Sequence, residues 1–470
     1  MNKLTYTAEK KSIEILVNHI LKDKDPEGRK KKLKHLTFVM QHLFGDLFES
    51  SSFEGACRLI DEGGKWFQFL NRALDTLNPN VVKTAVMNLG FEAGFAGLRI
   101  RDAAKAKYHC NIPWAILFDP TSACNLRCIG CWAAEYGHTL NLSMDVMDKI
   151  VREGRELGCH FYLLTGGEPL VRKADILKLC RKYRDCEFHA FTNGTLIDED
   201  FCKEVTDVGN LSFSISIEGF RDVNDSRRGA GDFDKVMHAM DLLREHGIVF
   251  GTSICYTRKN IDTVTSDKFL DLLISKGAWY TWYFHYMPVG NDASVDLLPT
   301  AQQRAYMVRR VRELRGVKGG KAIFPIDFQN DGQFIDGCVA GGRNYCHINP
   351  NGDVEPCVFI HYSSANINDK SLLECLQQPI FQEYAKGQPF NHNHLRPCPM
   401  LENPQYLQEM VTRCGAKSTD MQSPESAEHL CAKCAEYAKE WRPVADKLWA
   451  EIQEKEAAEA EDKRQQSAGH

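Results

Sequence analysis

Three cysteines near residue 128 could do metal chemistry. Cys124, Cys128 and Cys131 follow the spacing CxxxCxxC and offer three thiolate ligands within one short loop. A structural zinc site and a cubane [4Fe–4S] cluster both normally take four protein ligands. A loop with only three thiolates therefore either recruits a distant fourth ligand or leaves one metal open to a substrate or cofactor.

The other cysteines divide into a second group and a scattered set. The chain has 18 cysteines, and in a reducing compartment so many thiols favour metal binding or catalysis over disulfides. Cys338, Cys346 and Cys357 lie close together, and Cys431 and Cys434 form a late CxxC pair. The isolated cysteines are interpreted as ordinary buried thiols: Cys57, Cys110, Cys159, Cys180, Cys186, Cys202, Cys255 and Cys375.

Six units, each a short apolar run followed by a helical pattern, must position the first cysteine group. The runs are continuously apolar, as expected for parallel strands buried on both faces. Six such units predict an α/β fold with a partial (β/α)6 TIM-like barrel. The cysteine loop directly follows the first run, at the end of the strand where barrels place their chemistry. The runs cover residues 115–118, 161–165, 188–192, 211–217, 249–256 and 279–287.

The flanking segments give the chain four expected regions. Residues 1–108 show only helical spacing of apolar residues and form a helical N-terminal region whose apolar faces pack on each other or on the next domain. Residues 109–330 form the barrel. Residues 331–400 form a small Cys-rich extension, with a hairpin at Asn351–Gly352 and one helix over 371–387. Residues 401–470 form a helical C-terminal tail.

A cysteine triplet after the first strand of a βα array resembles the radical S-adenosylmethionine (radical SAM) superfamily. The resemblance implies a [4Fe–4S] cluster on Cys124, Cys128 and Cys131, with the remaining iron chelated by SAM. Reductive cleavage of SAM would then produce a 5′-deoxyadenosyl radical that abstracts hydrogen from a substrate. In such a reaction the cofactors carry the chemistry and the protein positions them.

Further motifs match this superfamily at the expected strand ends. Thr165–Pro169 resembles the GGEP motif, which lines the SAM amino group. Residues 224–229 resemble the HDxxRG segment, whose arginine reaches the SAM carboxylate, a task that suits a planar cation. The resemblance implies SAM contacts from Gly166, Gly167, Glu168, Asn193, Ser214, Ser216 and Arg228.

The chain departs from the superfamily pattern at one position. The residue before the third cysteine is usually aromatic and lies near the adenine, whereas here it is Gly130. Trp132, just after the third cysteine, is the expected partial replacement.

The second cysteine group resembles the start of a SPASM or shortened SPASM (twitch) domain. Gly352 and Cys357 match its Gly-to-Cys spacing, and the resemblance implies an auxiliary [4Fe–4S] cluster on Cys338, Cys357 and Cys398. Cys346, Cys431 and Cys434 are the candidates for a fourth ligand. A structural zinc or rubredoxin-like iron site remains the alternative. The histidines of this region are interpreted as solvated loop residues: His347, His392 and His394.

Composition narrows the remaining functional classes. The net charge of −5 predicts no strong nucleic-acid affinity, and no apolar run is long enough to span a membrane. With no recognisable secretory signal, we expect a cytoplasmic enzyme that works anaerobically. An external one-electron donor such as a flavodoxin or ferredoxin would reduce the cluster. The substrate could be a peptide, a lipid or a small molecule.

Two alternatives from other functional classes remain open at the level of sequence. One is an iron–sulfur electron carrier or redox sensor that never cleaves SAM. The other is a zinc-dependent structural protein. The GGEP-like segment and Arg228 argue against a carrier, because a carrier needs no pocket for a sulfonium compound.

Overall fold

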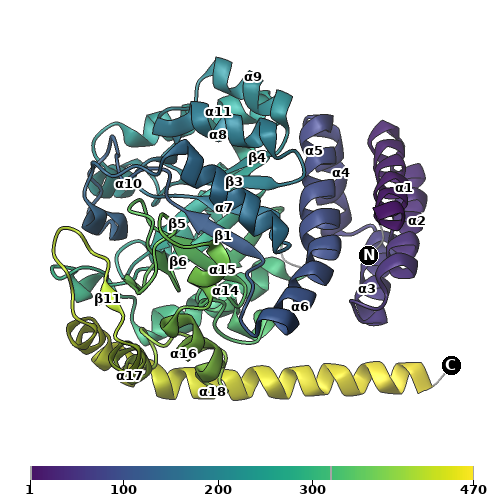
Figure 1. The fold of residues 1–470 in the computed structure, drawn as a ribbon. Helices are drawn as coiled ribbons and strands as arrows, with labels where there is room; N and C mark the ends of the chain where they lie inside the picture. The colour runs from purple at the N-terminus through teal and green to yellow at the C-terminus, as the bar shows by residue number, and fades with distance from the viewer. Residues whose placement is uncertain (1–2, 318–319, 469–470) are drawn as a thin grey trace.

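A curved, mainly parallel sheet lies at the centre of the computed structural model, which describes residues 3–317 and 320–468 (Figure 1). Its strands follow the order β7-β6-β5-β4-β3-β2-β1-β8-β9, so the six predicted strands lie side by side in chain order and the partial barrel is confirmed. The strands are β1 (Ala115–Phe118), β2 (Phe161–Leu164), β3 (Glu187–Thr192), β4 (Leu211–Ser216), β5 (Phe250–Tyr256), β6 (Tyr280–His285), β7 (Phe324–Asp327), β8 (Tyr345–Ile348) and β9 (Val354–Glu355).

Two parallel strands outside the six predicted units extend the sheet. β7 pairs with β6, and β8 pairs with β1 in the register Ala115↔Tyr345. β8 and β9 form the hairpin expected at Asn351–Gly352, with Ile348 opposite Val354, whereas the pairing of β8 with β1 was not predicted. The start of the Cys-rich extension is therefore hydrogen-bonded to the first strand of the barrel, and β7 and β9 are the two edges of the open sheet.

The helices that follow the strands pack on the outside of the sheet and return the chain to its opposite end. Ser143 caps the first of them through Val146 N, as its sequence position predicts. These helices are α7 (Met144–Glu156), α8 (Lys173–Lys182), α9 (Glu199–Val208), α10 (Arg221–Arg228), α11 (Asp232–Glu245), α12 (Ile261–Val264), α13 (Asp267–Ser275) and α14 (Ala301–Arg315).

The N-terminal region is helical, as predicted, and lies at one side of the barrel (Figure 1). Its inner helices contact the start of the strands: Asn88 donates to the Cys186 carbonyl, and Trp66 packs on Phe324 with ring centroids 5.6 Å apart. α1 and α2 form a smaller core with the π-helix at Val86–Ala96, around Phe44 and Phe91. The helices are α1 (Lys3–Lys22), α2 (Pro26–Phe44), α3 (Ser50–Glu62), α4 (Lys65–Thr76), α5 (Pro79–Ala85), a π-helix at Val86–Ala96 and α6 (Gly97–Tyr108).

The C-terminal segments wrap the open end of the barrel. The single helix expected over 371–387 is two helices, because Pro379 begins the second one and has no amide hydrogen to continue the first. The elements are β10 (Tyr362–Ser363), α15 (Leu372–Leu376), α16 (Pro379–Gly387), α17 (Pro404–Cys414), β11 (Lys417–Ser418) and α18 (Ala427–Ala468).

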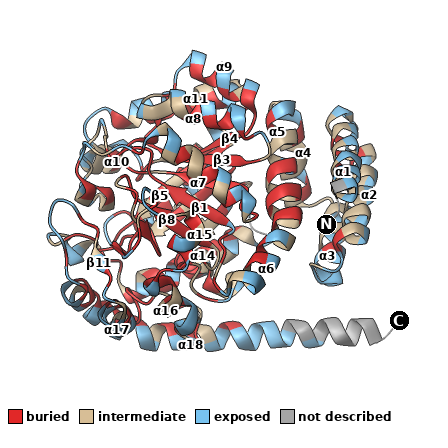
Figure 2. Ribbon diagram, in the orientation of Figure 1, coloured by how far each residue is buried: buried red, intermediate tan, exposed pale blue. Residues whose placement is uncertain are grey.

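Buried residues concentrate on the sheet and on the helix faces that cover it (Figure 2). One large core joins the barrel, the extension and the first part of α18, so these parts pack as one body. Within the described ranges, none of the helices has the length and hydropathy that a membrane span needs.

Candidate functional site

The cysteine triplet lies in the loop between β1 and a short 3₁₀ helix, Trp132–Tyr136. All three thiols are half-buried. Burial raises the pKa of Cys124 to about 11. Burial also raises the pKa of Cys128, whereas the nearby Arg228 and Arg227 lower it. The loop therefore gathers three partly desolvated thiols beside two guanidinium groups that favour thiolates.

The Gly-Gly pair allows the loop after β2 to lie directly against the cysteine loop. Gly167 donates to the Thr121 carbonyl (3.0 Å) and Glu168 N donates to the Ala123 carbonyl (2.8 Å). A Cβ on Gly167 would lie 2.3 Å from the Ala123 carbonyl oxygen, and Gly166 has φ +107°. No other residue type fits this backbone-to-backbone approach without moving one of the two loops.

Gly167→Ala should displace the cysteine loop and lower the iron content of the reconstituted protein. The added methyl would press on backbone atoms, which cannot rotate away as a side chain would. The measurement is iron per chain after anaerobic reconstitution. Gly55→Ala is the matched control, because a Cβ there meets no atom within 4 Å. Full iron loading of Gly167→Ala would contradict the prediction.

Glu168 ties the ends of β2 and β3 together. Its buried carboxylate accepts hydrogen bonds from Thr192 Oγ1 (2.6 Å), Asn193 N (2.8 Å) and Leu170 N (2.9 Å). Burial raises the pKa of Glu168. Asn193 in turn donates from Nδ2 to Asn125 Oδ1 in the cysteine loop (2.8 Å). Glu168 and Asn193 therefore hold the ends of β2 and β3 in place beside the cysteine triplet, where they form one wall of a cavity.

Two adjacent arginines at the end of α10 share one buried carboxylate. Arg227 Nη1 and Arg228 Nη2 each lie 2.6 Å from Glu218 Oε1, and the Glu218 side chain is 1% exposed. Arg227 also exchanges backbone and side-chain hydrogen bonds with Ile129 (3.0 Å each). Arg227 was not among the predicted site residues, although the Arg-Arg pair at 227–228 was visible in the sequence.

Ser216 lines the cavity as predicted, whereas Ser214 is not among the described residues that line it. Ser214 lies between Ser212 and Ser216 on the same face of β4 and is fully buried, with His189 Nε2 2.8 Å from its Oγ. His189 Nδ1 also lies 2.9 Å from Ser212 Oγ. Ser214 thus positions His189, and a direct contact with SAM stays a prediction for both Ser214 and Ser216.

An unpredicted aromatic residue covers Gly130. Gly130 has φ +68°, and a Cβ there would lie 3.2 Å from the ring of the buried residue Tyr286, at the end of β6. Trp132 also lines the cavity, but its ring packs toward the extension, with centroids 5.7 Å from His347 and 6.2 Å from Phe359. The aromatic residue beside Gly130 is therefore Tyr286, which comes from the end of β6 and not from the cysteine loop.

A cavity of 1170 Å³ opens beside the cysteine triplet. Its size exceeds the roughly 300–1,000 Å³ of ordinary ligand pockets, so it has room for a nucleoside cofactor and a second molecule. The predicted site residues that line it are Cys124, Cys128, Cys131, Trp132, Gly166, Gly167, Glu168, Asn193, Ser216 and Arg228.

The cysteines of the extension gather around Tyr384. The Tyr384 hydroxyl is buried without a hydrogen-bond partner among the described residues. Burial raises the Tyr384 pKa well above its usual value, and four nearby thiols raise it further: Cys338, Cys357, Cys398 and Cys431. Tyr345 donates to Cys357 Sγ (2.7 Å). Thiols that surround an unpaired hydroxyl donor form a set that an iron–sulfur cluster would fit, because its sulfides are acceptors.

The alternatives for the fourth ligand separate in space. Cys346 points to the other face of β8, where its neighbours are Cys159 and Cys375. Cys431 and Cys434 lie one turn apart on α18, and both are buried. Cys346 is therefore separated from the other cysteines of the extension, whereas Cys431 on α18 lies near Tyr384.

His347 is not a solvated loop residue, because it lies fully buried on β8. Its ring nitrogens are 3.2 Å from Asp119 and 2.7 Å from Glu355. Burial opposes protonation, but these two carboxylates raise the His347 pKa to about 10. Glu355 also accepts from Tyr136 in the cysteine segment (2.9 Å). The contacts of His347 and Glu355 with Asp119 and Tyr136 therefore connect the cysteine loop to the extension. His392 is exposed, as expected, and His394 is half-buried.

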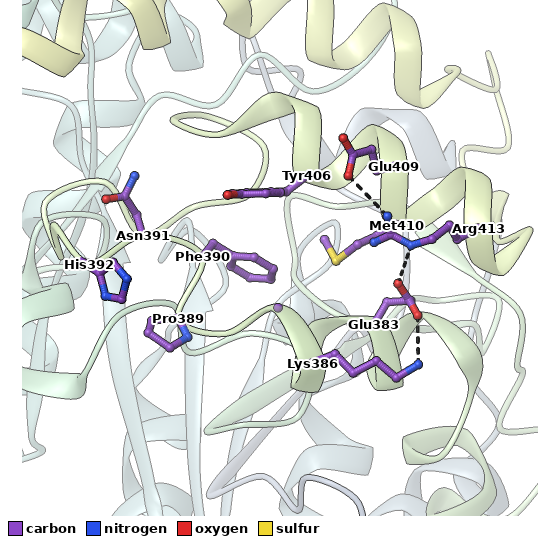
Figure 3. Close-up of a pocket in the computed structure, with 11 residues that line it drawn as sticks. Glu383, Lys386, Pro389, Phe390, Asn391, His392, Tyr406, Glu409, Met410 and Arg413 are labelled. Carbon is purple, nitrogen blue, oxygen red and sulfur yellow. Dashed lines mark hydrogen bonds and ion pairs between the residues drawn. The ribbon is translucent and has the colours of Figure 1, made fainter.

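A second hollow lies between α16 and α17, on the surface of the extension (Figure 3). Its charged groups pair with each other, as Arg413 contacts both Glu383 (2.8 Å) and Glu409 (3.3 Å). Tyr406 lies over Phe390 at its rim. None of the predicted ligands lines this hollow.

Comparison with protein-family models matches two parts of the chain. Residues 118–270 match the radical SAM superfamily. Residues 338–400 match an iron–sulfur cluster-binding domain, SPASM. These two segments contain the cysteine triplet, and Cys338, Cys357 and Cys398, respectively.

Similar proteins act on different substrates. An AdoMet-dependent heme synthase of Methanosarcina barkeri is 24% identical, over 56% of this chain and 82% of its own. A mycofactocin maturase of Mycolicibacterium smegmatis is 29% identical, over 53% of this chain and 64% of its own. The crystal structure of Streptococcus suis SuiB bound to its precursor peptide SuiA shares the fold, with a TM-score of 0.53 and 16% identity over 80% of this chain and 89% of that one.

Proposed function

We propose that this chain, a radical SAM superfamily protein with a SPASM extension, is an enzyme that reductively cleaves SAM to abstract hydrogen from a substrate. The observation that carries this proposal is the arrangement at the end of the cavity beside the cysteine triplet, which we call its upper end. There, the cysteine triplet is clamped by the Gly166–Gly167 loop and faces the Glu218–Arg228 pair.

The chain's own residues hold and orient the reactants. A [4Fe–4S] cluster held by the cysteine triplet would supply one electron for the cleavage of SAM into methionine and the 5′-deoxyadenosyl radical, which would take a hydrogen atom from the substrate. Cys124, Cys128 and Cys131 would supply three thiolates and leave one coordination site to SAM. The Gly166–Glu168 segment would line the SAM amino group, and its glycines leave space for that approach.

We assign the ends of SAM to residues on two sides of the cavity. Arg228 would hold the carboxylate, since its guanidinium has donors beyond the two, Nε and Nη2, that bind Glu218. Tyr286, which covers Gly130, would pack on the adenine in place of the aromatic residue missing at that position. Trp132 would lie between the SAM site and the extension.

An auxiliary [4Fe–4S] cluster would occupy the group of cysteines around Tyr384. Its proposed ligands are Cys338, Cys357, Cys398 and Cys431, and Tyr384 would donate a hydrogen bond to a cluster sulfide. Such hydrogen bonds tune the potential of an iron–sulfur cluster. A flavodoxin or ferredoxin is the proposed external electron donor.

The test of this function is SAM cleavage by the anaerobically reconstituted full chain. Incubation with SAM and dithionite should yield 5′-deoxyadenosine and methionine in equal amounts. An iron–sulfur protein that only carries electrons would be reduced without forming either product, and that result would overturn the proposal.

Arg228→Ala should weaken SAM binding without loss of iron. Losing a charge-assisted hydrogen bond costs about 1.5–3 kcal/mol, which corresponds to a Kd higher by roughly 10- to 150-fold. Isothermal titration of the reconstituted protein measures this. Arg221→Ala is the control on the same helix, because Arg221 forms an exposed ion pair with Asp234. Equal SAM affinity for both variants would show that Arg228 does not contact the cofactor.

A further inference from the structure

The cavity beside the cysteine triplet continues through the barrel to its opposite end. Its lining includes Glu218 after the end of β4 and Ser212 near the start of the same strand. At about 3.3 Å per residue, these two positions lie roughly 20 Å apart. Trp114 and Phe324, at the beginnings of β1 and β7, line the far end. Closed barrels of this type are filled by layers of side chains, so an open interior is a specific feature of this chain.

Alternate residues of the strands face this channel, and most of them are apolar. The charged residues at its upper end belong to the SAM site, and Arg315 and Asp331 pair with each other at 2.5 Å beside β7. The buried carboxylate of Asp327 on β7 also lines the channel and accepts a hydrogen bond from Asn330 Nδ2 (2.8 Å). His189, in the middle, is neutral because burial lowers its pKa to about 3. The apolar lining residues include Leu89, Leu117, Phe161, Leu163, Phe191, Trp282, Phe284, Ile326, Phe328 and Val339.

The lower mouth of the channel, formed by Trp114, Phe324 and Phe334, is apolar and exposed. These side chains line the channel and are also 37%, 41% and 59% exposed. The Arg315 guanidinium lies 5.4 Å from the ring centroids of both Phe324 and Phe334, so it holds the two rings on either side of it. This mouth lies along β7, which is an edge strand of the open sheet.

We propose that this channel binds a long acyl chain, of a free fatty acid or of a membrane lipid, which enters at the lower mouth beside Trp114 and reaches toward the SAM site. The proposal rests on the proposed function, because it names the substrate class of that site. The apolar core of a bilayer is about 30 Å thick, so one lipid chain extends about 15 Å. This length is less than the roughly 20 Å between Glu218 and Ser212 along β4, so a chain of this size can lie within the channel.

A peptide suits this channel less well than a hydrocarbon chain. Every residue of a peptide carries an amide donor and a carbonyl acceptor, and each one buried without a partner costs about 1–3 kcal/mol. In the part of the chain that the structure describes, the lower channel offers few partners. The indole nitrogen of Trp282 is buried and unpaired, whereas the Tyr280 hydroxyl already donates to the Phe213 carbonyl (2.7 Å).

The test is the binding of cis-parinaric acid, a fluorescent fatty acid, to the reconstituted full chain in the presence of SAM. Phe334→Asp places a charge in the lower mouth, and Ile326→Trp fills the channel from the edge strand. Each should weaken binding about tenfold or more, equivalent to about 1.4 kcal/mol. Tyr406→Asp is the matched control, because Tyr406 is a 40% exposed aromatic residue at the rim of the other hollow (Figure 3). Iron content and melting temperature report whether each variant is folded.

A second arm uses phosphatidylglycerol vesicles that carry a parinaroyl chain, which separates a membrane source from a free one. Binding from either source that Phe334→Asp and Ile326→Trp both weaken supports the proposal. Equal binding by all variants, or channel-dependent binding of an apolar peptide in place of the fatty acid, overturns it. Formation of 5′-deoxyadenosine by the wild-type protein is measured separately. If SAM is cleaved and the acid does not bind, only the acyl-chain proposal fails.

Discussion

Replacement of Cys124, Cys128 and Cys131 by alanine should abolish 5′-deoxyadenosine formation and remove about four of about eight iron atoms per chain. The physical reason is that no other thiol can take over. Cys255 also lines the cavity, but it lies on β5, outside the loop. Loss of all three thiolates therefore leaves SAM without a cluster at its own site.

The measurement is product formation by chromatography together with iron analysis and electron paramagnetic resonance of the reduced protein. Cys255→Ala is the control within the same cavity and should keep both iron and activity. Continued 5′-deoxyadenosine formation by the triple variant would refute the assignment of the triplet.

The auxiliary site gives the second large effect. In the triple variant about half of the iron should remain, and it should disappear when Cys338 and Cys357 are also replaced. Cys431→Ala alone should weaken or convert the auxiliary cluster, because it removes one of the four thiols around Tyr384. Cys346→Ala is the matched control, since Cys346 is equally buried but lies on the other face of β8.

Iron and zinc analysis after anaerobic reconstitution measures this effect. Stoichiometric zinc with no iron in the triple variant would show that the extension holds a structural zinc site. In that case the radical SAM core would be unaffected. If Cys346→Ala lost the cluster and Cys431→Ala kept it, the assignment of the fourth ligand would be wrong.

Much of the barrel was predictable because its information is local. Each parallel strand is a short run of apolar residues, and several helices begin at a side-chain cap, as at Ser143, Asp198 and Ser266. The position of the cysteine triplet after the first run follows from the same pattern. The six units, the hairpin at Asn351–Gly352 and the helical N-terminus are therefore confirmed.

What the spacing could not reveal depends on contacts between distant segments. β8 joins the sheet beside β1 although more than 200 residues separate them, and no local pattern indicates such a pairing. His347 was misjudged for the same reason, because its burial comes from Asp119 and Glu355 on neighbouring strands. Likewise, Tyr286 covers Gly130 from β6, where a single-residue motif would not place it.

The sequence by itself determined the type of chemistry, because ligand type and spacing within one loop decide which metal centre that loop can hold. Only the tertiary structure decided which cysteines lie together and what they face. It placed Cys338 and Cys357 near Cys398 and placed Cys431 of α18 near Tyr384, and it turned Cys346 away. It also left the barrel open from the cysteine loop to Phe324 and Phe334, because the volume of an interior depends on how side chains from many strands meet.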